Sequence, residues 1–314
     1  LLRPKIPQLK WSQRRLDWRK WLTAHKGLAA RNKLAARKVA WYAIGSLALA
    51  VVLVWSAVFS LPDRRLHAYF LDVGQGDAIL LRTPGGQVIL VDGGPDPVLL
   101  TSRLGQVLPF WQQRVDLVVA THADQDHLSG LIGVVQRYRV GQVLQPASLG
   151  DGALAAQWEK ALHAAGVQAI SAQRGMRVSL GDGVSLEVLH PPPRDIVGAQ
   201  EEEDNRNSLV LRVSQGACSL LLMADVDTEG EEELLQAGQI APSTILKVAH
   251  HGSASSSSAR FLAAVDPQVA VISVGAGNRF GHPAEEVLQR LQDIGCRVYR
   301  TDEQGTIEVT TDGE

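Results

Sequence analysis

The pattern of apolar and charged positions divides the chain into a basic segment, one long apolar run and a region of short runs. Residues 39–61 carry no charge, and a helix of that length, at about 1.5 Å per residue, spans a bilayer core of about 30 Å. Trp41, Tyr42 and Trp55 stand where interfacial anchors are expected. We therefore predict a transmembrane helix over residues 39–62. A signal peptide is the alternative, but its apolar core is typically about 7–15 residues long.

Charge differs strongly on the two sides of this run. Residues 1–38 hold twelve of the 31 Lys and Arg residues and one of the 33 acidic residues, so the rest of the chain has a net charge of about −13. Basic residues flank the cytoplasmic end of membrane helices. The sequence therefore predicts that residues 1–38 are a cytoplasmic connector or an amphipathic segment on anionic lipid, and that the chain after the helix lies on the other side.

Short apolar runs predict one β-rich domain over residues 65–314. Strands are predicted first at residues 67–73, 77–83, 87–92, 115–121, 142–145, 176–180, 184–190, 208–213 and 218–223. Helices then alternate with strands, with helices at 227–236, 257–265 and 283–294 and strands at 245–249, 269–274, 298–301 and 306–310. This order predicts an α/β fold in which two sheets pack face to face with helices outside.

Four potential metal ligands follow the strand predicted at residues 115–121. They are His122, Asp124, Asp126 and His127. Histidines and carboxylates packed so closely dehydrate or repel one another unless a cation lies among them. A strand followed by a tight turn can direct the first two side chains at one cation and the last two at a neighbouring cation. The alternative is a polar loop that caps the following helix.

This run is similar to the H-x-H-x-D-H signature of the metallo-β-lactamase superfamily, with Asp124 in the position of the second histidine. The resemblance implies the four-layer αββα metallo-β-lactamase fold and a site for two divalent metal ions. Because an oxygen donor replaces a nitrogen donor, we expect Mn²⁺ to be favoured, with Zn²⁺ or Mg²⁺ as alternatives.

Later stretches match the superfamily in chain order. The resemblance implies that Asp225, which ends the run LLLMAD, bridges the two metals. In KVAHHGS it implies that His251 ligates the second metal, with His250 nearby as a further ligand or a substrate contact. The position at which the superfamily has another histidine falls within residues 204–208, where Asn205 or Asn207 offers a carbonyl oxygen or water completes the site; a turn before a strand is the alternative. His282 is a candidate donor to a phosphate or leaving group, or a structural histidine.

Further segments resemble the ComEC family of DNA-internalisation competence proteins. They are FLDVGQGDA at residues 70–78, VDGG at 91–94, HHGS at 250–253 and VGAGNRFGHP at 274–283, and the likeness covers nearly all of residues 66–310. It implies a protein of the bacterial cell membrane, with the hydrolase domain on the extracytoplasmic side. The partners implied are the remaining channel portion of the same protein and the DNA-uptake machinery.

The function that this resemblance implies is a metal-dependent nuclease. It would degrade the non-transported strand of incoming DNA during natural transformation, with Asp126 and Asp225 holding the metals that activate water and with single-stranded DNA as the expected substrate. Two alternatives remain: a lactonase or small phosphodiesterase with the same metals, and a non-catalytic DNA-guiding module. A domain of this acidity repels DNA in bulk solution, so delivery by the channel is part of the hypothesis.

Overall fold

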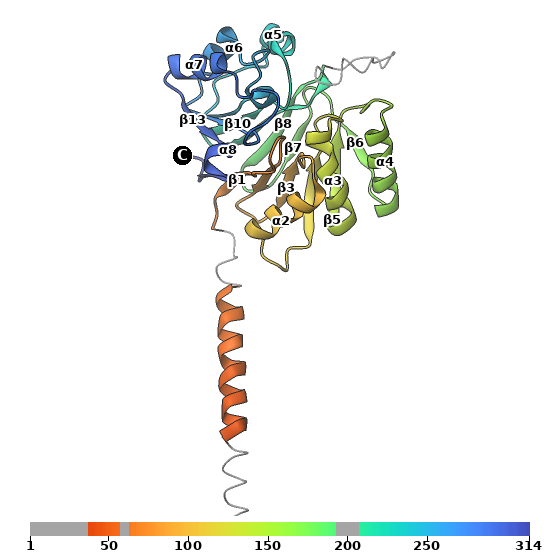
Figure 1. Ribbon diagram of the computed structural model, residues 1–314, viewed down its shortest axis with the longest axis vertical. Helices are drawn as coiled ribbons and strands as arrows, with labels where there is room; N and C mark the ends of the chain where they lie inside the picture. Colours follow the sequence, from red (N-terminus) through yellow and green to blue (C-terminus); the bar gives the residue numbers. More distant parts are fainter. Residues whose placement is uncertain (1–36, 57–62, 193–206) are drawn as a thin grey trace, which may run out of the picture. The chain divides into compact units, whose positions relative to one another are not determined.

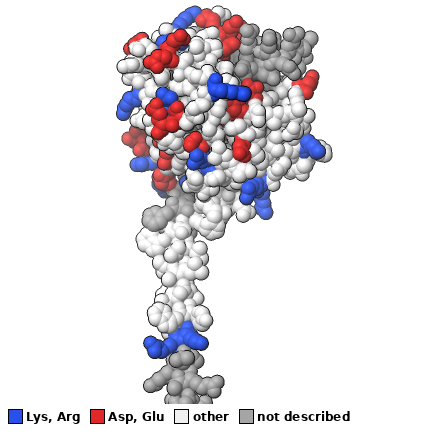
Figure 2. Space-filling model, in the orientation of Figure 1, with Lys and Arg blue, Asp and Glu red and all other residues white. Residues whose placement is uncertain are grey.

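The structure, a computed structural model, describes residues 37–56, 63–192 and 207–314. The chain divides into two compact units, Leu1–Leu61 and Pro62–Glu314. In the first unit, Arg37–Ser56 forms a helix of 20 residues that is long and apolar enough to cross a membrane. Figure 2 shows this helix without charged side chains except at its start. Most of the predicted basic segment lies outside the described residues.

The second unit contains two seven-stranded sheets. The first sheet has the order β14-β1-β2-β3-β4-β5-β6. Strands β3 to β6 are parallel to one another, whereas β2 and β14 run antiparallel to β1. Its strands are β1 (Leu66–Phe70), β2 (Ile79–Arg82), β3 (Val88–Val91), β4 (Arg114–Val119), β5 (Arg139–Gln145), β6 (Ala169–Ser171) and β14 (Ile307–Thr311).

The second sheet has the order β13-β12-β11-β10-β9-β8-β7. Its strands β10 to β13 are parallel, and β7 to β10 form an antiparallel meander. These strands are β7 (Arg177–Ser179), β8 (Val184–His190), β9 (Val210–Gln215), β10 (Cys218–Leu222), β11 (Ile245–Lys247), β12 (Val269–Ile272) and β13 (Arg297–Arg300).

Helices cover the outer face of each sheet (Figure 1). One apolar cluster fills the space between the two sheets, and two more lie beneath the helices of either side. The first sheet is covered by α2 (Pro97–Val107), α3 (Gln125–Arg137) and α4 (Ala153–Ala165). The second is covered by α5 (Thr228–Gln236), α6 (Ala259–Val265) and α7 (Glu285–Asp293), while η3 (Ala249–Gly252) and α8 (Thr301–Gln304) are short connections. The predicted αββα layering is confirmed.

Among the described residues, helices α2 and α4 and strand β6 were not expected from the sequence, and neither were the short helices η3 and α8. Helix α2 buries only Leu100 and Leu104, and α4 is rich in alanine, so neither has a strong apolar stripe. Local signals still define both helices. Asp96 caps the start of α2 through the N–H groups of Val98 and Leu99, and Gly166 ends α4 in the left-handed conformation.

The parallel pairs of strands decide where the chemistry lies. Strands β3 and β4 are parallel neighbours in the first sheet, and β10 and β11 are parallel neighbours in the second. Parallel neighbours end at the same edge of a sheet, so the loops after β3 and β4 start side by side, as do those after β10 and β11. All four of these loops contribute side chains to one buried cluster.

Candidate metal centre

The densest group of buried donors lies where the loop after β4 meets the loops after β10 and β11. The Nε2 atoms of His127 and His251 are 3.3 Å apart. Asp225 places Oδ1 3.2 Å from the first nitrogen and Oδ2 3.4 Å from the second. Asp126 adds a fourth donor, since its Oδ2 lies 3.4 Å from His251 Nε2. Residues distant in sequence therefore converge on one point.

These separations match the spacing of ligands around one cation. Two donors at about 2.0–2.2 Å from a metal in tetrahedral geometry lie roughly 3.3–3.6 Å apart. The four distances in this group run from 3.2 to 3.4 Å. The Oδ1 atom of Asp225 is buried and has no hydrogen-bond partner among the described residues. A buried acceptor without a partner is costly, and a cation among these donors removes that cost.

A second group lies directly beside the first and is built from His122 and Asp124. The Nε2 atom of His122 is buried without a hydrogen-bond partner in the described part of the chain and lies 3.6 Å from Asp124 Oδ2. The rings of His122 and His127 have centroids 4.1 Å apart, so the two groups of donors are in contact. Asp124 occupies the N-cap position of α3 but makes no capping hydrogen bond. Its carboxylate faces the histidine instead, which argues against a simple helix cap.

Asp92, at the end of β3, orients both histidines of the β4 loop. Its Oδ2 accepts a hydrogen bond from His127 Nδ1 at 2.9 Å and another from the Thr121 hydroxyl at 2.7 Å. With its hydrogen directed at Asp92, the Thr121 oxygen is left to accept from His122 Nδ1 at 2.9 Å. Both imidazoles then carry their hydrogen on Nδ1 and turn an unprotonated Nε2 toward the cluster. Carboxylates behind metal-binding histidines act in this way.

His251 is oriented from behind by the second sheet. Its Nδ1 lies 2.9 Å from the carbonyl oxygen of Ser273, which leaves Nε2 free as a donor to a cation. Asp77 Oδ1 is 3.4 Å from the same Nδ1, and Asp77 Oδ2 is 2.7 Å from the ammonium of Lys247. Asp77 and Lys247 are both buried. Because Asp77 lies behind the ring, we interpret it as a support for His251 and not as a ligand.

The backbone of the site is strained. His250 and His251 both have positive φ, at 49° and 54°, as do Asp92 at 56° and Ala224 at 47°. Left-handed conformations cost free energy in residues other than glycine and concentrate at functional sites. Here Asp225 and His251 follow or occupy such positions, so the surrounding packing holds them in an otherwise unfavourable geometry.

The protonation states of Asp225, His127 and His251 depend on one another. Burial disfavours ionisation of Asp225, but His251 and His127 outweigh this and hold its pKa well below the usual range. Burial likewise opposes protonation of the two histidines, yet Asp225 raises the pKa of both well above 6.5. Without a cation, protons on these imidazoles balance the buried carboxylate. Protonated histidines thus compensate the charge of Asp225 in the metal-free site, and a bound cation would do so in their place.

The remaining predicted residues lie at the rim or outside the description. His250 Nε2 is 3.8 Å from Asp225 Oδ2 and the side chain is 29% exposed, so it borders the cluster. The His282 ring lies 5.8 Å from that of His250 between centroids. Burial, and then the neighbouring His250 and His251, lower the pKa of His282. Asn205 lies outside the described residues.

Sequence reasoning assigned no role to Asp77, Asp92, Thr121 or Lys247. Asp77 begins a predicted strand, Asp92 and Thr121 each end one, Lys247 lies within one, and the two acids fall in the stretches that carry the ComEC resemblance. A polar residue at a strand end is the only local signal, and it does not distinguish a support from an ordinary turn. Their roles depend on which strands are neighbours.

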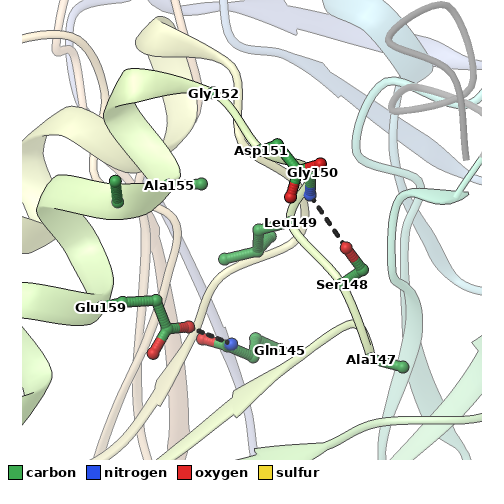
Figure 3. Close-up of a pocket in the computed structure, with 10 residues that line it drawn as sticks. Gln145, Ala147, Ser148, Leu149, Gly150, Asp151, Gly152, Ala155 and Glu159 are labelled. Atoms are coloured by element: carbon green, nitrogen blue, oxygen red, sulfur yellow. Dashed lines mark hydrogen bonds between the residues drawn. The ribbon is translucent and has the colours of Figure 1, made fainter.

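A pocket lies one strand away from the β4 loop, at the end of β5 (Figure 3). It has a volume of about 380 Å³. The N–H of Ala120 donates to Leu144 O at 3.0 Å, which puts the pocket next to the residues that lead into the metal loop. Gln145 accepts from Trp158 Nε1 at 2.7 Å and donates to Glu159 at 3.0 Å. The His/Cys/Asp/Glu groups at metal-ligand spacing in the described residues lie in the His/Asp cluster, so we place the chemistry there and not in this pocket.

Comparisons with known proteins agree with this geometry. The model of the metallo-beta-lactamase superfamily matches residues 71–276. ComE operon protein 3 of Bacillus subtilis (strain 168) is 32% identical over 259 residues, which are 76% of this chain and 32% of that protein. Competence protein ComA of Neisseria gonorrhoeae is 34% identical over 253 residues, 79% of this chain and 33% of that protein. The chain therefore spans about a third of the length of these relatives.

Among solved structures, the diiron β-hydroxylase CmlA from Streptomyces venezuelae is similar with a TM-score of 0.50 and 17% identity, over 80% of this chain and 54% of that one. At that identity the likeness shows the fold alone. The family match covers most of the domain and includes the loops after β3, β4, β10 and β11. This chain therefore belongs to the metallo-β-lactamase superfamily.

Proposed function

We propose that this domain binds two divalent cations and hydrolyses phosphodiester bonds of DNA, as the nuclease part of a membrane protein of DNA uptake. The observation that carries the proposal is the buried cluster at ligand spacing, with donors from the loops after β4, β10 and β11. The similarity to competence proteins supports the DNA-uptake role, and the apolar helix supports membrane attachment.

The donors would hold two cations. His122 and Asp124 would bind one, and Asp126, His127 and His251 would bind the other. Asp225 lies against His127 and His251 and would be shared between the two, as the superfamily resemblance implies. Three donors are imidazole nitrogens and three are carboxylates, which is richer in oxygen than typical structural zinc sites. This composition supports Mn²⁺ as the preferred ion, with Mg²⁺ or Zn²⁺ as alternatives.

Two bound divalent ions would activate water for attack on phosphorus and offset charge on the attacking and leaving oxygens. The protein side chains then have distinct tasks. Among the donors grouped with His127 and His251, Asp126 is the most exposed, at 27%, and would orient the attacking water from the solvent side. His250 and His282 border the opening, where their N–H groups reach a phosphate oxygen or the leaving group. The lowered pKa of His282 leaves it neutral at pH 7.

The domain has a net negative charge, so binding of DNA, a polyanion, requires positive charge close to the site. On the face in Figure 2, the described acidic and basic side chains are interspersed and form no continuous basic band. Long-range attraction of DNA is therefore weak, and the cations supply the local positive charge. We infer that the substrate strand is delivered by the membrane part of the protein.

The test is a cleavage assay with the full chain in detergent micelles. Labelled single-stranded and double-stranded DNA and a panel of lactones are incubated with Mn²⁺, Mg²⁺ or Zn²⁺. Asp225→Asn removes the charge of the shared carboxylate, and Asp96→Asn is the matched control, since Asp96 is exposed, caps the start of α2 and is not one of the grouped donors. We expect metal-dependent DNA cleavage that falls at least about 100-fold in the first variant and is unchanged in the control.

Three results would contradict the proposal. Equal DNA cleavage by both variants would assign the activity to another site or to a contaminant. Lactone hydrolysis without DNA cleavage would identify a different hydrolase of the superfamily. Stoichiometric metal binding without turnover of either substrate class would favour a non-catalytic DNA-guiding module.

A further inference from the structure

The loop between α2 and β4 exposes two large aromatic side chains. Phe110 is 78% exposed and Trp111 is 41% exposed. Their rings pack edge to face with centroids 4.7 Å apart, so they form one apolar knob. The knob is held by Leu108, which is buried, and by a turn in which Gln112 N donates to Pro109 O at 2.8 Å. Two adjacent exposed aromatic side chains on one loop indicate a contact surface.

Strand directions place this knob on a defined edge of the domain. Strand β1 is antiparallel to β2, β2 is antiparallel to β3, and β3 is parallel to β4. Strands β1 and β4 therefore run in the same direction and begin at the same edge of the first sheet. The chain enters β1 at Leu66, directly after the segment that follows the apolar helix. Figure 1 shows the start of β1 and the loop before β4 on the same side of the domain.

The distances along this edge are short. Strands β1 and β4 are separated by two strands, which corresponds to roughly 15 Å at about 4.8 Å per step. The described part of the apolar helix reaches Ser56 and β1 begins at Leu66, and ten residues span at most about 35 Å. In a chain whose helix crosses a bilayer, the start of β1 therefore lies within about 35 Å of Ser56, which allows this edge of the domain to contact the headgroup layer. The metal centre lies at the opposite edge, where β3 and β4 end.

Two exposed arginines flank the start of β5, beside the loop that carries the aromatic knob. The N–H of Arg139 donates to Gln113 O at 2.8 Å, so the start of β5 is fastened to the loop. Arg137 and Arg139 are exposed, and among the described residues neither forms an ion pair. Aromatic rings beside guanidinium groups match the chemistry of the lipid headgroup layer, where Trp is enriched and phosphates accept from Arg.

We propose that Phe110 and Trp111, with Arg137 and Arg139 beside them, dock this edge of the domain onto the phospholipid headgroup layer. The contact holds the metal centre facing away from the bilayer. It would limit rotation of the domain about its tether, so that a strand leaving the membrane meets the site in one orientation. This inference rests on the proposed membrane attachment and not on the nuclease activity.

The test measures how close the loop lies to lipid in the full chain, reconstituted into vesicles of phosphatidylcholine with phosphatidylglycerol. A fluorophore is placed on the loop through Gln113→Cys, and quenching by headgroup-spin-labelled lipid is recorded. Ala254→Cys, exposed beside His251 at the opposite edge, is the control position. Leu47→Cys in the apolar helix reports insertion through acyl-chain-labelled lipid. The native Cys218 and Cys296 are buried, and labelling of the unsubstituted chain measures their background.

We expect at least about threefold stronger headgroup quenching at Gln113 than at Ala254. The pair Phe110→Ser and Trp111→Ser should reduce it to the Ala254 level without changing the signal at Leu47. Equal quenching at the two domain positions, with Leu47 quenched by acyl-labelled lipid, would overturn docking while leaving the membrane attachment intact. If quenching is lost when the protein is diluted at constant lipid, the loop contacts another copy of the chain and not lipid, and the docking proposal is overturned. An unquenched Leu47 would refute the attachment itself, and the docking with it.

Discussion

Asp92 is the residue whose replacement tests the architecture of the site most directly. Its carboxylate accepts hydrogen bonds from Thr121 N at 2.8 Å, the Thr121 hydroxyl at 2.7 Å and His127 Nδ1 at 2.9 Å. In Asp92→Asn the side chain keeps its shape but only one acceptor oxygen. The amide nitrogen then faces a donor whichever way the side chain turns. At least one hydrogen bond is lost, and the negative charge behind the histidine disappears.

The expected magnitude follows from these contacts. A hydrogen bond to a charged group contributes about 1.5–3 kcal/mol, so the metal-free protein should lose stability of that order. Groups that orient a metal-binding histidine typically change metal affinity by about 10–100-fold when replaced, equivalent to about 1.4–2.8 kcal/mol. Both Nε2 donors that depend on Asp92, those of His127 and His122, lose their fixed tautomer.

The measurement is a calorimetric titration of Mn²⁺ into the metal-free full chain, with a urea unfolding curve for each variant. Asp96→Asn is the matched control, since Asp96 accepts from Val98 N at the start of α2 and Asn caps helices as well as Asp does. We expect the control to keep its affinity and stability. A folded Asp92→Asn protein whose affinity lies within about threefold of the unsubstituted chain would refute the role of Asp92.

Three further predictions address other parts of the site. Lys247→Met leaves the Asp77 carboxylate buried without its partner and should lower the free energy of unfolding by about 3–5 kcal/mol. Adding Asp77→Asn should restore part of that stability, and an unchanged urea midpoint in Lys247→Met would contradict this. Gly76→Ala would place a Cβ in steric conflict with the carbonyl oxygen of Asp126 and should weaken Mn²⁺ binding at least about tenfold. Gly74 also has positive φ, but a Cβ there meets nothing within 4 Å, so Gly74→Ala should cost only about 1–2 kcal/mol of stability. Because the pKa values of the two site histidines are raised above 6.5 and cation binding needs unprotonated Nε2, affinity should fall as pH is lowered, with proton release persisting above pH 6.5; buffer-independent binding heats across that range would oppose this.

Local patterns were sufficient for the residues that follow one another in the chain. His122, Asp124, Asp126 and His127 fall within one turn after a strand, and that density alone indicated a cation site before any neighbour was known. The apolar run likewise appears as the helix Arg37–Ser56. Both signals are short-range, because a turn and a helix are determined by residues close in sequence.

Contacts between residues distant in sequence could not be predicted from local patterns. Helices α2 and α4 have weak apolar stripes, and their stability comes from packing on the first sheet. Asp92 became part of the site only when β3 was placed beside β4, and Asp77 only when folding brought it behind His251 and against Lys247.

The sequence by itself determined the donor types, the order of the strands that carry them and the apolar span that precedes them. The tertiary structure alone decided which nitrogen of each histidine faces the cluster, which carboxylates stand behind the rings, and which edge of the domain carries the exposed aromatic pair. The physical reason is that hydrogen-bond geometry and strand neighbours depend on atoms brought together by folding, whereas residue type and local periodicity are present in the chain before it folds.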